Sequence, residues 1–96
     1  MVDTANKFSL WAIEIFVASV EEGSISAAAK RLNSSNSTIS QQLTNLEAAL
    51  GSELLDRSTR PMKLKPTGQL FLHRARAILS EVMQAKSELA QFDHSQ

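Results

Sequence analysis

Apolar residues recur at steps of three and four along much of the chain, which is the spacing that places them on one face of a helix. The first such stretch covers residues 10–23 and ends in a glycine, which readily adopts the left-handed conformation that closes a helix. Its regularly spaced apolar residues are Leu10, Ile13, Phe16, Val17 and Val20. Trp11 and Ile15 widen this face, and we predict that both pack in the core.

Two further helices are predicted close together. Ser24 can cap the second helix by accepting a backbone N–H, and a narrow, alanine-rich apolar stripe follows it. Asn33 tolerates the left-handed conformation that ends a helix, and Ser35 can cap the next one. Two helices joined by such a short turn form a helix-turn-helix, whose second helix can enter the major groove of DNA.

The third predicted helix, residues 35–50, carries amides and hydroxyls on its outer face rather than the Glu and Lys usual on a surface helix. Such groups both donate and accept hydrogen bonds, which suits the edges of DNA bases. The candidates on and beside this face are Ser37, Thr38, Gln41, Thr44 and Asn45. Taken alone, the segment fits an ordinary amphipathic helix equally well, so its neighbours decide the interpretation.

Two short apolar-containing runs, residues 53–57 and 62–64, flank the turn-forming segment Ser-Thr-Arg-Pro and predict a small hairpin. A two-stranded ribbon is not stable alone, so it should lean on the helices as a wing. Arg60 lies at the predicted tip, with Arg57 and Lys63 on either side. We interpret these cations as contacts to DNA phosphate or to the minor groove; a solvated loop is the alternative.

The last helix is predicted over residues 67–92, with Pro66 at its start. Its apolar residues follow the heptad spacing of a coiled coil, with a second stripe beside it. A helix of about 26 residues spans roughly 39 Å, too long for so small a domain to cover, which predicts a homodimer. The predicted dimerisation residues are Phe71, Ala75, Ile78, Leu79, Val82 and Leu89.

The predicted fold is therefore mainly α: a winged helix-turn-helix of three helices and a two-stranded β wing, followed by a long dimerising linker helix. We divide the chain into an N-terminal extension at 1–9, the winged helix-turn-helix at 10–65, the linker helix at 66–92 and a tail at 93–96. The three glycines are interpreted as punctuation between elements.

The charge is neutral in total but polarised along the chain. Ten basic residues balance ten acidic ones, which by itself argues against a nucleic-acid partner. However, residues 1–29 carry a balance of −3, whereas residues 57–76 hold six basic residues and no acid. A local positive field of this kind can hold phosphate even on a neutral molecule.

Several other functions are not expected. There is no cysteine, and His73 and His94 have no partner at ligand or catalytic spacing, so we predict no metal, no cofactor and no enzymatic activity. The apolar runs are too short to span a membrane, and the polar first residues lack a signal-peptide pattern. We therefore expect a protein without a membrane partner, located in the cytoplasm.

The run FVASVEEGSISAAAKRLNSSNSTISQQLTNLEAALG, followed by LLDRSTRPMKLKPTG, resembles the N-terminal DNA-binding domain of LysR-type bacterial transcriptional regulators. The resemblance covers about residues 10–89. It implies a dimeric, double-stranded-DNA-binding module of the bacterial nucleoid. It places Asn36, Ser37, Thr38, Ser40 and Gln41 at DNA-contacting positions of the recognition helix, and Arg57 and Arg60 at those of the wing.

This chain also departs from the family pattern. The family usually has Arg at the position of Gln41, so this protein should read a different base or bind more weakly. It usually has Gln at the position of Asn36, often Pro at that of Ser37, an apolar residue at that of Ser34 and a Thr cap at that of Lys65, so the turn and the linker-helix cap should be weaker here. The family continues into an effector-binding domain, and a small-molecule effector is expected only if such a domain belongs to this protein.

Two alternatives remain at this point. The second helix is also similar to that of the winged-helix domain of molybdate-type regulators, although the LE-x-x-LG and L-x-P-x-G spacings favour the LysR type. In a different class, the chain could be a protein-interaction module that pairs with a full-length regulator through its long helix. Such a module would not need base-reading amides or arginines on a wing.

Overall fold

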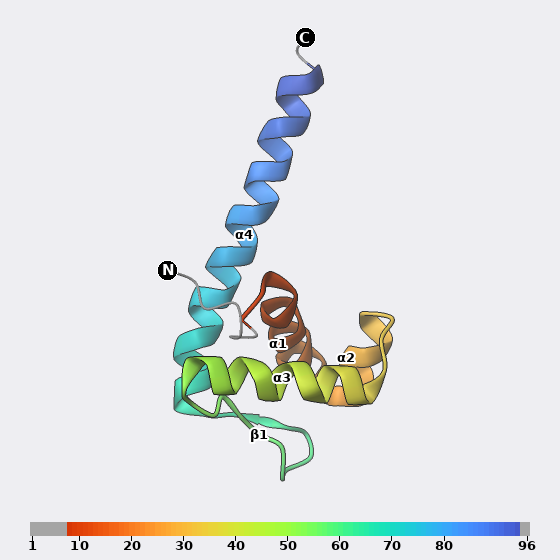
Figure 1. Ribbon diagram of the computed structural model, residues 1–96, viewed down its shortest axis with the longest axis vertical. Coiled ribbons are helices and arrows are strands. Elements are labelled where there is room, and N and C mark those ends of the chain that lie inside the picture. The colour runs from red at the N-terminus through yellow and green to blue at the C-terminus, as the bar shows by residue number, and fades with distance from the viewer. Residues whose placement is uncertain (1–7, 95–96) are drawn as a thin grey trace.

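The computed structural model describes residues 8–94, which form four helices and a two-stranded antiparallel ribbon (Figure 1). The elements are α1 (Leu10–Glu22), α2 (Ile25–Arg31), α3 (Asn36–Leu50), β1 (Leu55–Asp56), β2 (Lys63–Leu64) and α4 (Pro66–His94). The predicted fold class is confirmed, although the strands are shorter than predicted. Residues 1–7 of the predicted extension, residues 95–96 of the tail and the side chain of His94 lie outside what the structure describes.

Serine hydroxyls cap the first three helices. Ser24 Oγ accepts the Ala27 N–H at 3.0 Å, and Ser35 Oγ accepts the Thr38 N–H at 3.2 Å, so both predicted caps are confirmed. A third cap, Ser9, accepts the Ala12 N–H at 3.0 Å at the start of α1. Because Ser9 caps the first helix, the globular unit begins earlier than the predicted boundary after residue 9.

The turns between these helices use the left-handed conformation as predicted. Gly23 follows α1 with φ of 79°, and Gly51 follows α3 with φ of 71°. Asn33, in the turn between α2 and α3, has φ of 54°. Asparagine tolerates this region because its short polar side chain can hydrogen-bond locally, so the turn closes α2 without a glycine.

The core lies where α1 packs against α2, α3 and α4. Its largest fully buried apolar side chains are Ile13, Ile15, Phe16, Ile39, Leu43, Leu46 and Leu54. Burial of Ile15 confirms its predicted role, whereas Trp11 remains 42% exposed and its prediction as a core residue was wrong. Trp11 lies in the first turn of α1, and its neighbours Ala12 and Ile13 face the core instead.

The start of α4 is anchored to this core, and the rest of the helix extends away from it (Figure 1). The Phe71 ring lies 5.5 Å from that of Phe16 and 6.4 Å from that of Phe8, measured between centroids. Ala75 is fully buried. Its heptad position therefore faces the protomer's own core, and its prediction as a dimerisation residue was wrong. No helix among residues 8–94 is apolar over the length that crossing a membrane requires.

Gly68 lies where the start of α4 touches the segment before β1. A Cβ at this position would lie 2.1 Å from the Leu54 carbonyl oxygen. That carbonyl also accepts the Lys65 N–H at 2.9 Å, and the Thr67 hydroxyl donates to the Glu53 carbonyl. Gly68 therefore permits a close approach within a helix and does not merely punctuate the chain, which corrects the prediction from sequence.

Candidate nucleic-acid interface

An open groove of about 530 Å³ lies between the first turns of α2 and α3 and the ribbon formed by β1, β2 and their connecting loop, which we call the wing. The residues that line it are Ser24, Ile25, Ser26, Asn36, Ser37, Ser40, Arg57, Arg60 and Met62. The Met62 N–H donates to the Gly23 carbonyl at 3.1 Å, which ties the wing to the corner between α1 and α2. Three segments thus form one surface, in which two arginines and several serine hydroxyls lie beside the apolar Ile25 and Met62.

The outer face of α3 is polar and open, as predicted. Asn36, Ser37, Gln41 and Thr44 are exposed. Thr38 is half-buried, and its hydroxyl accepts a hydrogen bond from Ser35 Oγ at 2.8 Å. Part of the hydrogen-bonding capacity of Thr38 is therefore used inside the helix cap.

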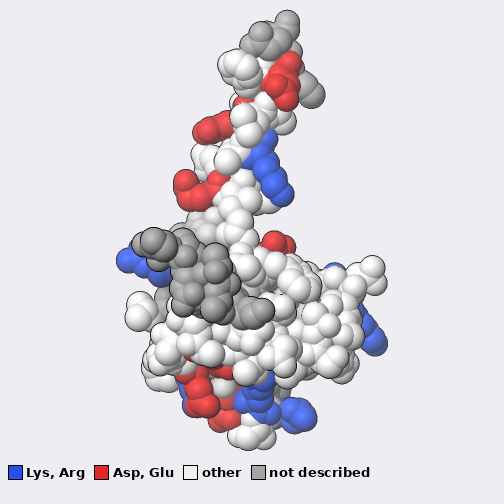
Figure 2. All heavy atoms as spheres, in the orientation of Figure 1, with Lys and Arg blue, Asp and Glu red and all other residues white. Residues whose placement is uncertain are grey.

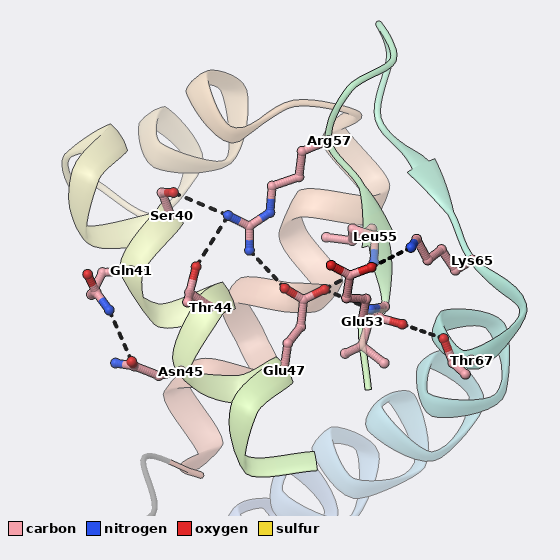
Figure 3. Close-up of polar contacts among 11 residues, drawn as sticks. Ser40, Gln41, Thr44, Asn45, Glu47, Glu53, Leu55, Arg57, Lys65 and Thr67 are labelled. Carbon is pink, nitrogen blue, oxygen red and sulfur yellow. Dashed lines mark hydrogen bonds and ion pairs between the residues drawn. The ribbon is translucent and has the colours of Figure 1, made fainter. Parts of the chain in front are cut away.

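Gln41 and Asn45 face each other one turn apart on this helix (Figure 3). Gln41 Nε2 donates to Asn45 Oδ1 at 3.1 Å. Gln41 is exposed, whereas Asn45 is half-buried. The two amides therefore form a pair before any ligand is bound.

Arg57 reaches from the wing across the side of α3 (Figure 3). Its Nη2 forms an ion pair with Glu47 Oε1 at 3.0 Å. Its Nη1 donates to Ser40 Oγ at 3.3 Å and to Thr44 Oγ1 at 3.4 Å. Arg57 was predicted to flank the wing tip, but its guanidinium lies against the predicted recognition helix instead. It consequently occupies hydroxyls that were themselves predicted DNA contacts.

Glu47 was not predicted as a site residue. Besides the ion pair with Arg57, its Oε2 accepts the backbone N–H groups of Leu54 and Leu55 at 2.7 and 3.3 Å. Its side chain is 14% exposed. The sequence held one signal for this role, because Glu47 is the only charged residue within α3. The Glu47 carboxylate thus holds both the backbone at Leu54 and Leu55 and the guanidinium of Arg57.

The wing tip is held by short-range hydrogen bonds. Asp56 Oδ1 accepts two hydrogen bonds from Ser58, one from its backbone N–H at 3.0 Å and one from its side-chain hydroxyl at 2.5 Å. These bonds lower the pKa of Asp56 below its ordinary value. Arg60 Nη1 donates to the Arg57 carbonyl at 3.3 Å. Arg60 and Lys63 are exposed, so their charges face solvent at the edge of the groove.

The basic segment 57–76 is less free than its sequence suggested. Three of its six cations pair with acids from other elements: Arg57 with Glu47, Lys65 with Glu53 at 2.6 Å, and Arg76 with Glu21 at 3.3 Å. Arg60, Lys63 and Arg74 form no ion pair within residues 8–94. The expected positive field is therefore reduced, and Figure 2 shows acidic side chains beside the basic ones at the lower end of the molecule.

A helix-turn-helix whose reading helix is braced by a two-stranded wing defines the winged helix-turn-helix class of proteins. The model of the lysR family of bacterial regulatory helix-turn-helix proteins matches residues 10–69, and the chain belongs to this family. It is 40% identical to the transcriptional regulator CrgA of Neisseria meningitidis over 77 residues. That alignment covers 80% of this chain and 26% of CrgA. It is 43% identical to BenM of Acinetobacter baylyi over 75 residues, and that alignment covers 78% of this chain and 25% of BenM. The chain thus spans about a quarter of the length of the curated relatives it matches.

Solved structures of this family share the fold. A complex of the BenM DBD with catB site 1 DNA superposes with a TM-score of 0.88 at 38% identity, covering 92% of this chain and 95% of that one. A CbnR DBD–DNA complex gives a TM-score of 0.82 at 37% identity, covering 88% and 97%. Both of those proteins carry DNA in their crystals.

Proposed function

We propose that this chain binds double-stranded DNA in a sequence-specific manner, as the homodimeric DNA-binding part of a LysR-type transcriptional regulator. The observation that carries the proposal is the groove, because it combines the exposed amides and hydroxyls at the start of α3 with an exposed arginine at the wing. We assign no catalytic step to it, and we place the protein at the nucleoid in the bacterial cytoplasm.

Base reading is assigned to the start and outer face of α3. Gln41 and Asn36 are exposed amides, and an amide can pair bidentately with adenine, which contributes about 1–3 kcal/mol of discrimination. Ser37 and Thr38 lie beside them in the first turn. Ser40 and Thr44 are assigned a lesser part because Arg57 already donates to both hydroxyls.

Phosphate binding is assigned mainly to the wing. Arg60 and Lys63 are exposed and have no ion pair within the described residues, so their full charge is available to the DNA backbone. Arg57 also lines the groove, but its guanidinium is bonded to Glu47. We therefore assign Arg57 a smaller share of the salt-dependent affinity than Arg60.

Dimerisation is assigned to the apolar face of α4 that the protomer leaves open. Leu89, on the same heptad stripe as Ile78 and Val82, is 67% exposed. Ile78, Leu79 and Val82 are half-buried and continue the face toward the core. A second copy would cover this surface, whereas Ala75 has no part in it.

The proposal is tested by selection from random DNA duplexes. The purified chain is incubated with the pool at low and moderate salt, the bound fraction is sequenced, and affinities are measured by fluorescence anisotropy. We expect enrichment of two half-sites related by a twofold axis. Binding that depends steeply on salt without any enrichment would contradict sequence specificity. Absence of binding at both salt concentrations would instead favour the protein-interaction module.

A further inference from the structure

The two arginines that line the groove differ in how much of their charge is free. Arg60 is exposed and forms no ion pair within the described residues. The Arg57 side chain is 29% exposed, and its Nη2 lies 3.0 Å from Glu47 Oε1. Its Nη1 contacts are longer, at 3.3 Å to Ser40 Oγ and 3.4 Å to Thr44 Oγ1. The Glu47 carboxylate is therefore the main partner of the Arg57 guanidinium.

Glu47 is held beside Arg57 by the backbone on its other side. Its Oε2 accepts the N–H groups of Leu54 and Leu55 at 2.7 and 3.3 Å. Both oxygens of a carboxylate accept hydrogen bonds, so the arrangement is the same whichever way the group is turned. The Glu47 side chain is 14% exposed, and salt screens a partly buried pair less than an open one. The negative charge therefore stays next to Arg57 at the edge of the groove.

A cation that is already neutralised adds little to the affinity for DNA. Each phosphate that a protein cation neutralises steepens the slope of log affinity against log salt by about 0.9. This contribution comes from the charge that the protein offers to the DNA backbone, and at Arg57 the adjacent carboxylate cancels that charge. The groove thus contains one arginine whose capacity for phosphate is not used.

We propose that Glu47 competes with DNA phosphate for Arg57 and thereby keeps the DNA affinity of this chain below what its groove residues allow. The inference rests on the proposed DNA binding and goes beyond it, because it gives an attenuating role to a residue that also supports the wing. Loss of the Glu47 charge should therefore strengthen binding. The gain should be similar for every sequence, because phosphate contacts carry no sequence information.

The test replaces Glu47 with Gln, which retains an oxygen to accept the Leu54 N–H but carries no charge to compensate Arg57. Glu53→Gln is the matched control, because Glu53 lines the same hollow beside the wing as Glu47. Its partner Lys65, at 2.6 Å, does not line the groove. Circular dichroism and urea unfolding verify that both variants are folded.

Binding of a labelled duplex of mixed sequence is followed by fluorescence anisotropy over a salt series. We expect Glu47→Gln to bind more tightly than wild type, with a slope steeper by up to about 0.9. Its advantage should therefore grow by about threefold between about 0.2 and 0.05 M salt. Glu53→Gln should gain much less, and Glu47→Gln should gain nothing in an Arg57→Ala background.

A second comparison leaves Glu47 unchanged and so does not depend on the folding of its variant. Arg57→Ala should reduce the wild-type slope by much less than Arg60→Ala does, and equal reductions would overturn the inference. The same gain in Glu53→Gln, or in the Arg57→Ala background, would also overturn it, because net charge alone would then explain the effect. An unchanged slope in Glu47→Gln would overturn it and leave the proposed function intact, whereas a wild-type chain that binds no duplex would overturn both.

Discussion

Arg57 and Glu47 form an ion pair in which Nη2 and Oε1 are 3.0 Å apart, with the two side chains only 29% and 14% exposed. Because Glu47 also accepts the backbone N–H groups of Leu54 and Leu55 at the start of β1, the pair joins the wing to α3 at both ends of the short strand. The relative placement of the two parts of the groove therefore depends on this carboxylate.

Replacing Glu47 with Ala should destabilise the fold. The Leu54 N–H, at 2.7 Å from Glu47 Oε2, would lose its partner in a largely buried position, which costs about 1–3 kcal/mol of the free energy of unfolding. The measurement is urea unfolding followed by circular dichroism. Glu88→Ala, at an exposed site on α4, is the control and should leave the midpoint unchanged. Equal midpoints for both variants would show that Glu47 does not brace the wing.

Replacing Gly68 with Ala should destabilise the protein even though alanine favours helix. The change gains about 1 kcal/mol in helix propensity, but the new Cβ would lie 2.1 Å from the Leu54 carbonyl oxygen. Separating α4 from this backbone should cost more than that gain, because overpacking typically costs about 1–3 kcal/mol and here the obstacle is main chain. Thermal unfolding should show a lower midpoint for Gly68→Ala than for wild type and for Gln69→Ala. A raised midpoint would contradict the close contact.

Replacing Arg60 with Ala should weaken binding to every DNA sequence by a similar factor. Loss of one phosphate contact should reduce the slope of log affinity against log salt by about one. Arg57→Ala should reduce the slope less, because Glu47 already compensates its charge. The measurement is anisotropy titration over a salt series, with Lys86→Ala on the distal part of α4 as the control. Equal slopes for wild type and Arg60→Ala would remove Arg60 from the interface.

Two positions of the same heptad pattern should respond differently to substitution. Leu89→Glu places a charge on a residue that is 67% exposed, so it should weaken dimerisation while preserving the fold of the protomer. Ala75→Leu should instead lower the stability of the protomer, because Ala75 is fully buried in its core. Analytical ultracentrifugation and thermal unfolding separate the two effects. A Leu89→Glu chain that sediments like wild type would contradict the assigned dimer face.

Acid should lower the stability of the protein through two carboxyl groups at the hairpin, Glu53 and Asp56. Hydrogen bonds from Lys65 lower the pKa of Glu53, and those from Ser58 lower the pKa of Asp56. A carboxyl with a lowered pKa in the folded state stabilises that state above its unfolded pKa, near 4, and loses this contribution as the pH falls through the folded value. The urea midpoint should therefore fall below about pH 4. The decline should be shallower in the double variant Glu53→Gln, Asp56→Asn, and an identical decline would contradict this origin.

The sequence by itself determined the helices, their order and the polar face of α3. These features depend on local properties: the spacing of apolar residues, the serine caps and the left-handed turn at Asn33 are all set by neighbours within one or two helical turns. The family resemblance rested on the same local patterns. The exposed candidates on α3, including Gln41, were therefore accessible to sequence reasoning.

The tertiary structure alone decided how these parts are used. Ala75 and Leu89 have the same heptad spacing, but only contact with α1 shows that Ala75 belongs to the core and Leu89 to the surface. The sequence placed Arg57 in a basic segment, whereas the fold brings Glu47 within 3.0 Å of it from a separate helix. Burial and charge pairing depend on which segments meet in space, and the local pattern of residues does not contain that information.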